Sequence, residues 1–484
     1  MNLRRAACGL VLAGLAACGE PPVHVQHRVI EIDIDDHGLL GLWGAQAPNL
    51  KGLIARGVYG YTRVIVPTHS NQSNYALLTA QYPDGNDVPG NSWLDRDLDY
   101  KHPIELGSIG LGNYGFWDQN PLRTRGDSLY TLTAQLGQRS AYFGQLPPFE
   151  AGATDAHFTI IGATLDGFML DYDTASGLVQ QFLKYPADVV AADHLDGPAA
   201  PGETLSHFVF ADAARYVKET PEPQIPRYMF IWDFIALDGD PTAEFGADGP
   251  ELRKVVEDYD AAIGVLLDAL GNKGLLDDTD IVFTLDHGKV NTHNQANLGS
   301  HGNTATAPAD GQLAALVTAM GPSVGITLDD YAIENEDGDA QIYAKVKDAG
   351  TLAGHAEQVR ITHALVDLIQ SGQLLGVDTT RTITWDGYKG TRRFHDYHAA
   401  GPHQADILVF PTDDWTLNQV DTVNGEPGPF IEHGGEPYGR HGGFSVDELY
   451  VPVILAGPSF KPGVMLPHPV NHPDVAATVA QVLP

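Results

Sequence analysis

One serine in a polar, turn-prone stretch of the chain has the setting of a nucleophile. Ser70 follows an apolar segment that ends at Val66, and an apolar-periodic run, Tyr75-Ala76-Leu77-Leu78, begins soon after it. A strand, a short loop and a helix in this order would place the hydroxyl near a helix N-terminus, where the helix dipole and unpaired N–H groups favour an alkoxide and an anionic substrate. Serine is also a common N-cap residue, and this stretch alone makes the N-cap the default interpretation.

Acidic and histidine residues follow several of the strands that the sequence predicts. The segments are Asp35-Asp36-His37-Gly38, Asp286-His287-Gly288, residues 233–240, and His441-Gly442 shortly before the last strand. In an open α/β sheet, ligands bind outside the carboxyl ends of the strands, and Asp and His are ligands that zinc prefers. Each residue alone is more often a turn or capping residue. Together they make this edge of the sheet a candidate metal site.

Alternating strands and helices predict an α/β fold with a doubly wound, mostly parallel sheet. The expected strands are residues 28–35, 61–66, 140–143, 227–232, 280–285 and 450–455. The expected helices are residues 48–57, 128–137, 204–218, 250–270 and 474–483. The alternation of strands and helices is interrupted at about residues 303–430, where we expect an inserted smaller α+β subdomain that includes an acidic loop at 328–341. Residues 28–484 would then form one domain with this insertion.

The N-terminal residues have the pattern of a bacterial export signal. Arg4 and Arg5 precede an apolar stretch, residues 6–17, that is too short to span a bilayer. Leu15-Ala16-Ala17-Cys18 is similar to a lipobox, which predicts a lipoprotein signal peptide at 1–17, a lipid on Cys18 and a tether at 18–27. The protein would then be anchored to a membrane of the cell envelope, on the periplasmic side or the outer surface. A plain secretory signal is the alternative.

Composition limits the partners that the protein can have. The only cysteines, Cys8 and Cys18, belong to the signal region, so the mature protein would have no internal disulfide. The net charge of -34 becomes -36 when Arg4 and Arg5 are removed, because no acidic residue is lost with them. This charge argues against binding to a nucleic-acid duplex. A small anionic ester remains a suitable substrate if metal ions supply the positive charge.

The ordered set of motifs resembles the alkaline phosphatase superfamily, and within it the type I phosphodiesterase / nucleotide pyrophosphatase family. The matching segments are Asp35, Ser70, Thr79-Ala80-Gln81-Tyr82-Pro83, Asn91, Asp286-His287-Gly288, Arg440-His441-Gly442 and Val451-Pro452-Val453-Ile454-Leu455-Ala456-Gly457-Pro458. They span nearly the whole mature chain in the order that the family has them. The order, more than any single motif, identifies the resemblance.

The resemblance implies an alkaline phosphatase-like fold and a metal-dependent hydrolase of phosphodiester or pyrophosphate bonds. It implies two Zn²⁺ ions, one held by Asp35, Ser70, Asp286 and His287, and a second held by His441 and Asp238. Ser70 would be the nucleophile and carry a covalent phosphoryl group during turnover. Asn91 would bind a non-bridging phosphoryl oxygen.

Departures from the family pattern keep other interpretations open. Thr242 stands where the second metal site expects a histidine, so Asp240 is a candidate oxygen ligand and the site would suit a harder ion or none. Asp36 and the segment Gly299-Ser300-His301-Gly302 resemble one-metal sulfatases and phosphonate monoester hydrolases, which makes Asp36 and His301 further candidate ligands. The residues after Ser70 lack the sulfatase pattern for formylglycine, so we expect an unmodified serine. A degenerate lipoprotein that only binds ligands is the alternative of another class.

Overall fold

The computed structural model describes the greater part of the chain, in several stretches. The described residues are 27–35, 45–94, 96, 103–105, 128–144, 158–161, 168–173, 178–184, 206–233, 250–299, 311–336, 338–348, 350–417, 430–432 and 438–483. Several predicted residues lie outside these stretches, namely Cys18, Asp36, Asp238, Asp240, Thr242 and His301. Their predicted roles therefore stay predictions.

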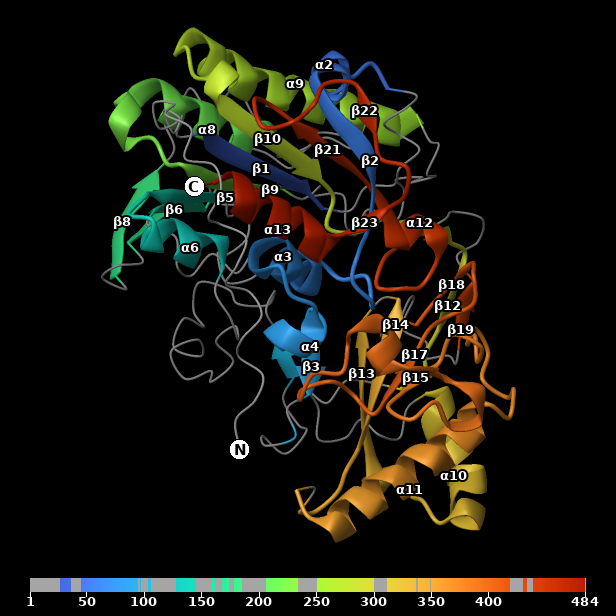
Figure 1. Ribbon diagram of the computed structural model, residues 1–484. Helices are drawn as coiled ribbons and strands as arrows, with labels where there is room; N and C mark the ends of the chain where they lie inside the picture. The colour runs from blue at the N-terminus through green and yellow to red at the C-terminus, as the bar shows by residue number, and fades with distance from the viewer. Residues whose placement is uncertain are drawn as a thin grey trace, which may run out of the picture.

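A large sheet lies at the centre of the main body of the molecule (Figure 1). Its order is β22-β2-β21-β10-β1-β9-β5-β6-β7-β8, and β23 also pairs with β2. The strands are β1 (Arg28–Ile34), β2 (Gly57–Arg63), β5 (Ser140–Gly144), β6 (Phe158–Ile161), β7 (Phe168–Asp173), β8 (Leu178–Lys184), β9 (Tyr228–Asp233), β10 (Thr279–Thr284), β21 (Tyr450–Ala456), β22 (Val464–Met465) and β23 (Val470–Asn471). The doubly wound, mostly parallel sheet that the sequence predicts is confirmed.

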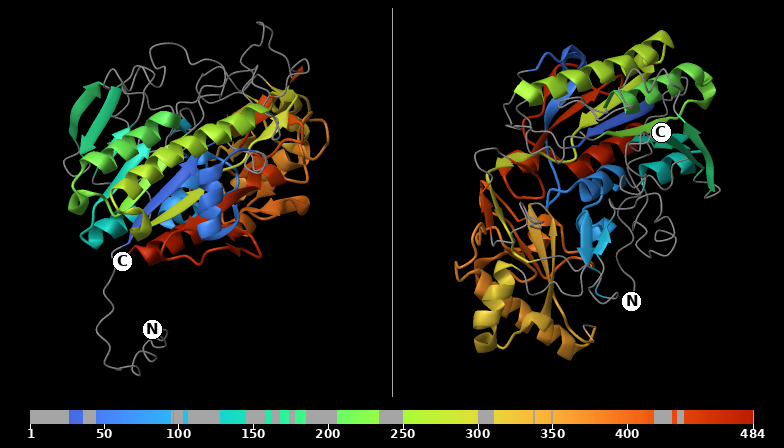
Figure 2. Two further views of the ribbon diagram at one scale, coloured as in Figure 1. Left: turned by 90° about the horizontal axis from the view of Figure 1, so that it is seen from above. Right: turned by 180° about the vertical axis from the view of Figure 1, so that it is seen from behind.

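Helices cover both faces of this sheet (Figures 1 and 2). One face carries α2 (Pro48–Arg56), α8 (Ser206–Glu219) and α9 (Pro250–Asn272), and the other carries α3 (Ser70–Thr79), α6 (Leu129–Gln135) and α13 (His472–Val482). Successive side chains of β1 point to opposite faces of the sheet, which explains this division. Ile30, Ile32 and Ile34 pack towards α8 and α9, whereas Val29 packs towards α3 and α13. No helix in the described stretches is long and apolar enough to span a membrane.

Strand direction brings the predicted chemical residues to one edge of the sheet. Strands β1, β10, β9 and β5 are parallel, whereas β21 is antiparallel to both β10 and β2. The carboxyl ends of β1, β2 and β10 therefore share an edge with the amino end of β21. Asp35, Ser70 and Asp286 come after their strands and His441 comes before its strand, so all four fall at this edge.

A second, smaller sheet has the order β13-β14-β17-β15-β16 and carries two helices (Figure 1). Its elements are β13 (Tyr331–Glu336), β14 (Asp339–Ala344), β15 (Ile383–Thr384), β16 (Arg392–Arg393), β17 (Ile407–Val409), α10 (Gln312–Val324) and α11 (Leu352–Ile369). Leu313 of α10, Ile342 of β14 and Leu365 of α11 belong to a separate hydrophobic core. The domain boundaries predicted from the sequence stay predictions.

Short elements complete the described stretches. They are α4 (Pro83–Asn86), β3 (Ser92–Leu94), β4 (Pro103–Glu105), η3 (Glu222–Gln224), η4 (Leu276–Asp278), β11 (Val290–Thr292), β12 (Asn294–Ala296), η6 (Leu328–Asp330), η7 (Tyr388–Gly390), η8 (Phe394–Tyr397), β18 (Trp415–Thr416), β19 (Phe430–Glu432), β20 (Tyr438–Arg440) and α12 (Val446–Leu449). Three small sheets join β3 with β4, β11 with β20, and β12 with β18 and β19. The last two lie next to the loop that carries His441.

Two sequence expectations about these elements are wrong. The strand expected at 61–66 is β2 (Gly57–Arg63), which ends where Arg63 pairs with Tyr450, the first residue of its partner β21. Residues 328–341, expected as an acidic loop, contain η6, all of β13 and the start of β14. Their charged side chains suggest a loop, but Glu334 is fully buried and accepts a hydrogen bond from Ser92 Oγ at 2.8 Å.

Candidate active site

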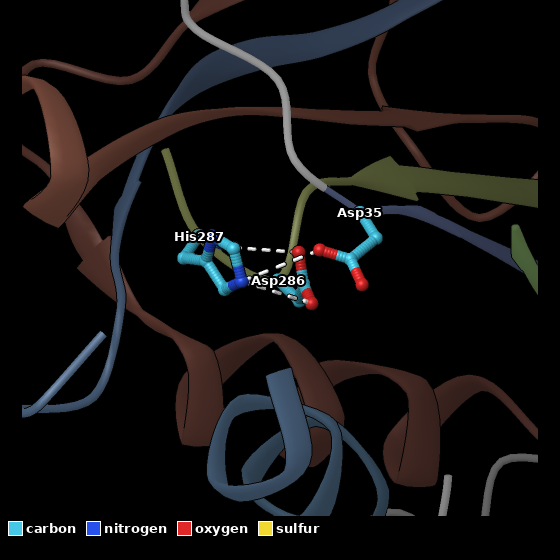
Figure 3. Close-up of side chains that lie close together, drawn as sticks. All are labelled: Asp35, Asp286 and His287. Carbon is cyan, nitrogen blue, oxygen red and sulfur yellow. Dashed lines mark hydrogen bonds and ion pairs between the residues drawn. The ribbon is translucent and has the colours of Figure 1, made fainter. Parts of the chain in front are cut away.

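Four predicted site residues converge at the shared edge of the large sheet. Ser70 Oγ donates to Asp35 Oδ2 at 3.2 Å and lies 3.0 Å from His287 Nε2. His287 Nε2 also lies 3.3 Å from Asp35 Oδ1 and 3.6 Å from Asp286 Oδ2. Figure 3 shows Asp35, Asp286 and His287 pointing towards one another. The structure thus brings together the residues predicted for the first metal, although their role as ligands stays a prediction.

Hydrogen bonds just beyond β1 and β10 hold the backbone of Asp35 and the carboxylate of Asp286. Asp35 N donates to Asp233 O at 2.8 Å, which continues the pairing of β1 with β9 beyond the strand. Asp286 Oδ1 accepts from His287 N at 2.8 Å and so holds its own carboxylate in place. Gly288 has no room for a side chain, since a Cβ there would lie 1.8 Å from Asp447 O. Close packing of α12 therefore explains the glycine of the Asp-His-Gly motif.

Ser70 is the first residue of α3, and His69 occupies the N-cap position. The Ser70 hydroxyl points to Asp35 and His287, so the capping interpretation does not describe this serine. Asn91 Oδ1 accepts from Asn71 N at 2.9 Å and thereby contacts the first turn of the same helix. This bond holds the Asn91 amide oxygen against the helix that begins at Ser70.

The electrostatics of the cluster suit a divalent cation. Burial, followed by the neighbouring His441, holds the pKa of His287 well below its usual range, so the ring is neutral. His287 Nδ1 lies 3.2 Å from Gly288 O, an arrangement in which Nδ1–H donates and Nε2 keeps its lone pair for a metal. The Ser70 proton can satisfy only one of the converging acceptors at a time, whereas a cation binds them together.

The donor set also matches a metal site in number and spacing. Asp35, Asp286 and His287 each offer one ligand atom, and these atoms lie within 4.8 Å of one another. All three residues are buried, with Asp35 8% exposed and the other two fully buried. Two carboxylates and one neutral imidazole, with a serine hydroxyl beside them, form a suitable set for Zn²⁺ or a similar divalent ion.

His441 lies beside this cluster on a separate loop. Its ring stacks on the ring of His287, with centroids 4.3 Å apart and planes 18° apart. His441 Nδ1 lies 3.4 Å from Thr68 O, and the predicted role of this histidine as a metal ligand stays a prediction. The loop is held by a buried ion pair of 3.1 Å between Arg440 and Glu448. Asp238, the partner predicted for His441 at a second metal, is outside the described residues.

Two residues next to the site were missed by the sequence analysis. His69 Nε2 lies 2.6 Å from Asp339 Oδ1, and both side chains are fully buried. Asp339 begins β14, in the segment that was expected to be a loop. The sequence signal was Asp337-Gly338, a dipeptide typical of two-residue hairpin turns, between β13 and β14.

A three-layer α/β fold with a serine hydroxyl among buried carboxylates at the strand ends is suited to ester hydrolysis. The family model described as type I phosphodiesterase / nucleotide pyrophosphatase matches residues 32–443. The chain belongs to this family, which confirms the family predicted from the sequence. It is therefore a phosphoric ester hydrolase of the phosphodiesterase and nucleotide pyrophosphatase class.

Solved structures of animal members of this class have a similar fold. An inactive threonine-to-alanine variant of murine ectonucleotide pyrophosphatase / phosphodiesterase 5, in complex with AMP, is similar with a TM-score of 0.59 and 14% identity, over 94% of this chain and 95% of that chain. The human protein of the same name gives a TM-score of 0.58 and 13% identity, over 94% of each chain. These identities show a shared fold. No curated protein sequence matches the chain significantly.

Proposed function

We propose that the protein is an exported, metal-dependent hydrolase of phosphodiester or pyrophosphate bonds in nucleotide-like substrates, with Ser70 as its nucleophile. The observation that carries the proposal is the position of Ser70 Oγ, 3.2 Å from Asp35 Oδ2 and 3.0 Å from His287 Nε2, at the first residue of a helix. Family membership supports the bond type. The AMP complex of a structural neighbour supports a nucleotide as part of the substrate.

The reaction divides into two displacements at phosphorus. Ser70 Oγ attacks the phosphorus and loses its proton, and the bond to the leaving alcohol or phosphate breaks, with the leaving group taking up a proton. The phosphoryl group, which keeps its other ester substituent, is then bound to Ser70 as a serine phosphodiester. Water attacks this covalent intermediate, releases a phosphate monoester and regenerates the serine hydroxyl. A divalent metal held by Asp35, Asp286 and His287 would make the hydroxyl more acidic and would neutralise charge on the phosphoryl oxygens.

The chain's own groups position the reactants for these steps. The Asp35 carboxylate accepts from Ser70 and so fixes the direction of Oγ. The N-terminus of α3, where Ser70 lies, favours the anionic phosphoryl group. Asn91 is tied to the same helix turn through Asn71 N, so its amide would be preorganised to donate to a phosphoryl oxygen.

We propose Zn²⁺ at the first position and a second ion beside it, bound by His441 and Asp238. The His441 ring stacks on His287, and its Nδ1 lies near Thr68 O. This placement beside the first cluster supports His441 as a ligand of the second ion. Thr242 replaces the histidine expected at that position, so the second ion should bind more weakly than the first. Metal analysis of the purified protein at graded free Zn²⁺ concentrations measures both occupancies, and a single ion at saturation would contradict the second position.

Replacement of the nucleophile tests the central proposal. Ser70→Ala should lower turnover of the p-nitrophenyl ester of a nucleoside 5′-monophosphate by at least about 1,000-fold, because the covalent step is lost. Release of p-nitrophenol measures this directly. Faster turnover of p-nitrophenyl sulfate or of a phosphonate monoester than of the diester would favour the sulfatase-like alternative.

A second serine at a helix start provides the matched control. Ser128 Oγ accepts from Thr131 N at 3.2 Å as the N-cap of α6. Ser128→Ala should cost about 1 kcal/mol of stability and leave turnover per folded molecule unchanged. Full activity in Ser70→Ala, or equal losses in both variants, would contradict a nucleophilic role for Ser70.

We also propose that a lipid on Cys18 anchors the protein to the bacterial cell envelope. The lipobox-like Leu15-Ala16-Ala17-Cys18 supports this placement. Cys18→Ser should shift the protein from the membrane fraction to the soluble fraction of a bacterial expression host, as measured by quantitative immunoblotting. Cys8→Ser, at the other cysteine, is the control and should stay with the membranes. Retention of Cys18→Ser on membranes would overturn the anchor.

A further inference from the structure

Three chain segments interlock directly behind the candidate active site. The β13–β14 hairpin approaches the His441 loop so closely that a Cβ on Gly338 would lie 2.0 Å from His441 O and 2.5 Å from Gly443 N. Gly442 has a φ of +81°, and a Cβ there would lie 2.5 Å from His69 Cε1. The hairpin and the His441 loop therefore pack backbone against backbone, and the missing side chain of Gly442 makes room for the His69 ring.

A buried polar contact joins two of these segments. Asp339, at the start of β14, and His69, the N-cap residue of α3, are both fully buried, with Oδ1 and Nε2 2.6 Å apart. Between two fully buried side chains, a short contact between a carboxylate and an imidazole fixes both strongly. This contact connects the second sheet to the residue that directly precedes Ser70.

His69 in turn contacts one side of His441. The two rings meet edge to face, with centroids 5.5 Å apart and planes 86° apart. The ring of His287 stacks on His441 with centroids 4.3 Å apart. Backbone contacts complete the set, since Thr68 O lies 3.4 Å from His441 Nδ1 and accepts from Gly442 N at 2.9 Å. The orientation of His441 thus depends on His69.

We propose that Asp339 and His69 are positioning residues that hold His441 in the orientation its metal ion requires. The β13–β14 hairpin thereby makes the second sheet part of the catalytic structure. Asp339 orients His69, His69 packs against His441, and His441 Nε2 keeps its direction. The inference rests on the proposed function, because it assigns His441 to the second ion. Groups that orient a metal-binding histidine typically contribute 10- to 100-fold to metal affinity.

Zinc binding to the full chain tests the proposal without depending on turnover. Equilibrium dialysis against graded free Zn²⁺, followed by metal analysis, gives the number and affinity of bound ions. Asp339→Asn and His69→Gln should each weaken the more weakly bound ion by about 10- to 100-fold and leave the first ion unchanged. The double variant should bind this ion no more weakly than either single variant does, because both residues act through one contact.

A similar pair elsewhere on the second sheet supplies the control. His363 on α11 lies 2.7 Å from Asp386, and Figure 1 shows α11 at the end of the second sheet that lies farther from the large sheet. Asp386→Asn should leave both ions bound as in the wild type. Thermal unfolding followed by circular dichroism gives the folded fraction to which the metal content is normalised. If Asp339→Asn does not fold, His69→Gln provides the same comparison.

The outcomes separate this inference from the proposed function. The positioning role is overturned if Asp339→Asn binds the weaker ion with the affinity of the wild type, or if Asp386→Asn weakens its binding equally. In both cases, turnover by the wild-type protein still supports the hydrolase. Loss of the first ion together with the second would show a general structural effect and also overturn it. A wild type that hydrolyses no phosphodiester contradicts the proposed function, whatever the variants bind.

Discussion

At the scale of single residues, depth along one strand decides what each carboxyl group of β1 can do. Glu31 and Asp33 lie within β1 and are fully buried, whereas Asp35 follows the strand, is 8% exposed and reaches Ser70. Burial, together with the charges of Asp35 and Glu31, raises the pKa of Asp33 well above its usual range. Of these three acidic residues, the outermost is therefore the one suited to bind a metal ion.

Glu31 leads to a prediction about stability. Burial raises the pKa of the Glu31 carboxyl from 4.5 to about 8, although the hydrogen bond from Tyr228 lowers it in part. Between these pH values the folded state keeps a proton that the unfolded state releases, so stability falls as the pH rises. Glu31→Gln should remove this loss and stabilise the protein by up to about 4 kcal/mol at pH 8 relative to its effect at pH 5.

Chemical unfolding at several pH values measures this effect. The stability difference between Glu31→Gln and the wild type should grow by up to about 1.4 kcal/mol per pH unit between pH 5 and 8. Tyr228 can donate to the Gln amide oxygen as it does to the carboxyl group, so this bond is expected to be kept. A difference that stays constant over this pH range would contradict a raised pKa.

The residues of the candidate site divide into those that the sequence could predict and those that it could not. Asp35, Asp286 and His287 could be predicted because they follow strands that the apolar pattern marks, and parallel strands bring their ends together. Ser70 could be predicted as well, although the strand before it ends at Arg63 and not at Val66. His69 could not, since a buried histidine looks the same in a sequence as an exposed one. Its partner Asp339 lies 270 residues away and meets it only in the folded chain.

At the scale of elements, the apolar strands were predictable and the charged strand was not. β1, β9, β10 and β21 are dominated by buried apolar side chains, so their periodicity marks them directly. β13 reads YAIENE, and its Glu334 and Asn335 are buried in contacts with other parts of the chain. Tertiary hydrogen bonds thus override a local pattern that suggests a loop.

The direction of β21 explains why His441 precedes its strand while the other site residues follow theirs. β21 is antiparallel to β10 and β2, so its amino end lies where their carboxyl ends lie. The sequence shows the strand and the histidine but not the direction, because an antiparallel strand has the same composition when both of its faces are buried. Only the pairing register fixes which end of β21 faces the site.

At the scale of the whole molecule, the first metal would link distant parts of the chain. Its predicted ligands follow β1, begin α3 and follow β10, so one ion would join residues 35, 70, 286 and 287. The chain has cysteines only at positions 8 and 18, and its net charge of -34 opposes compaction. Neutralising buried carboxylates with a cation should therefore contribute to the stability of the folded protein as well as to its chemistry.

Metal removal measures this contribution. An ion that binds only the folded state stabilises it by about 2.7 kcal/mol at a free concentration 100 times its dissociation constant, and by about 4.1 kcal/mol at 1,000 times. The melting temperature should therefore fall on chelation and rise again with free Zn²⁺ in differential scanning calorimetry. Asp286→Asn removes one ligand from the three-residue cluster, so its melting temperature should depend much less on Zn²⁺. The contrary result is a wild-type melting temperature that does not change with free Zn²⁺ although metal analysis shows the ion bound. The unfolded chain would then bind the ion as tightly as the folded protein does, and the site would not stabilise the fold.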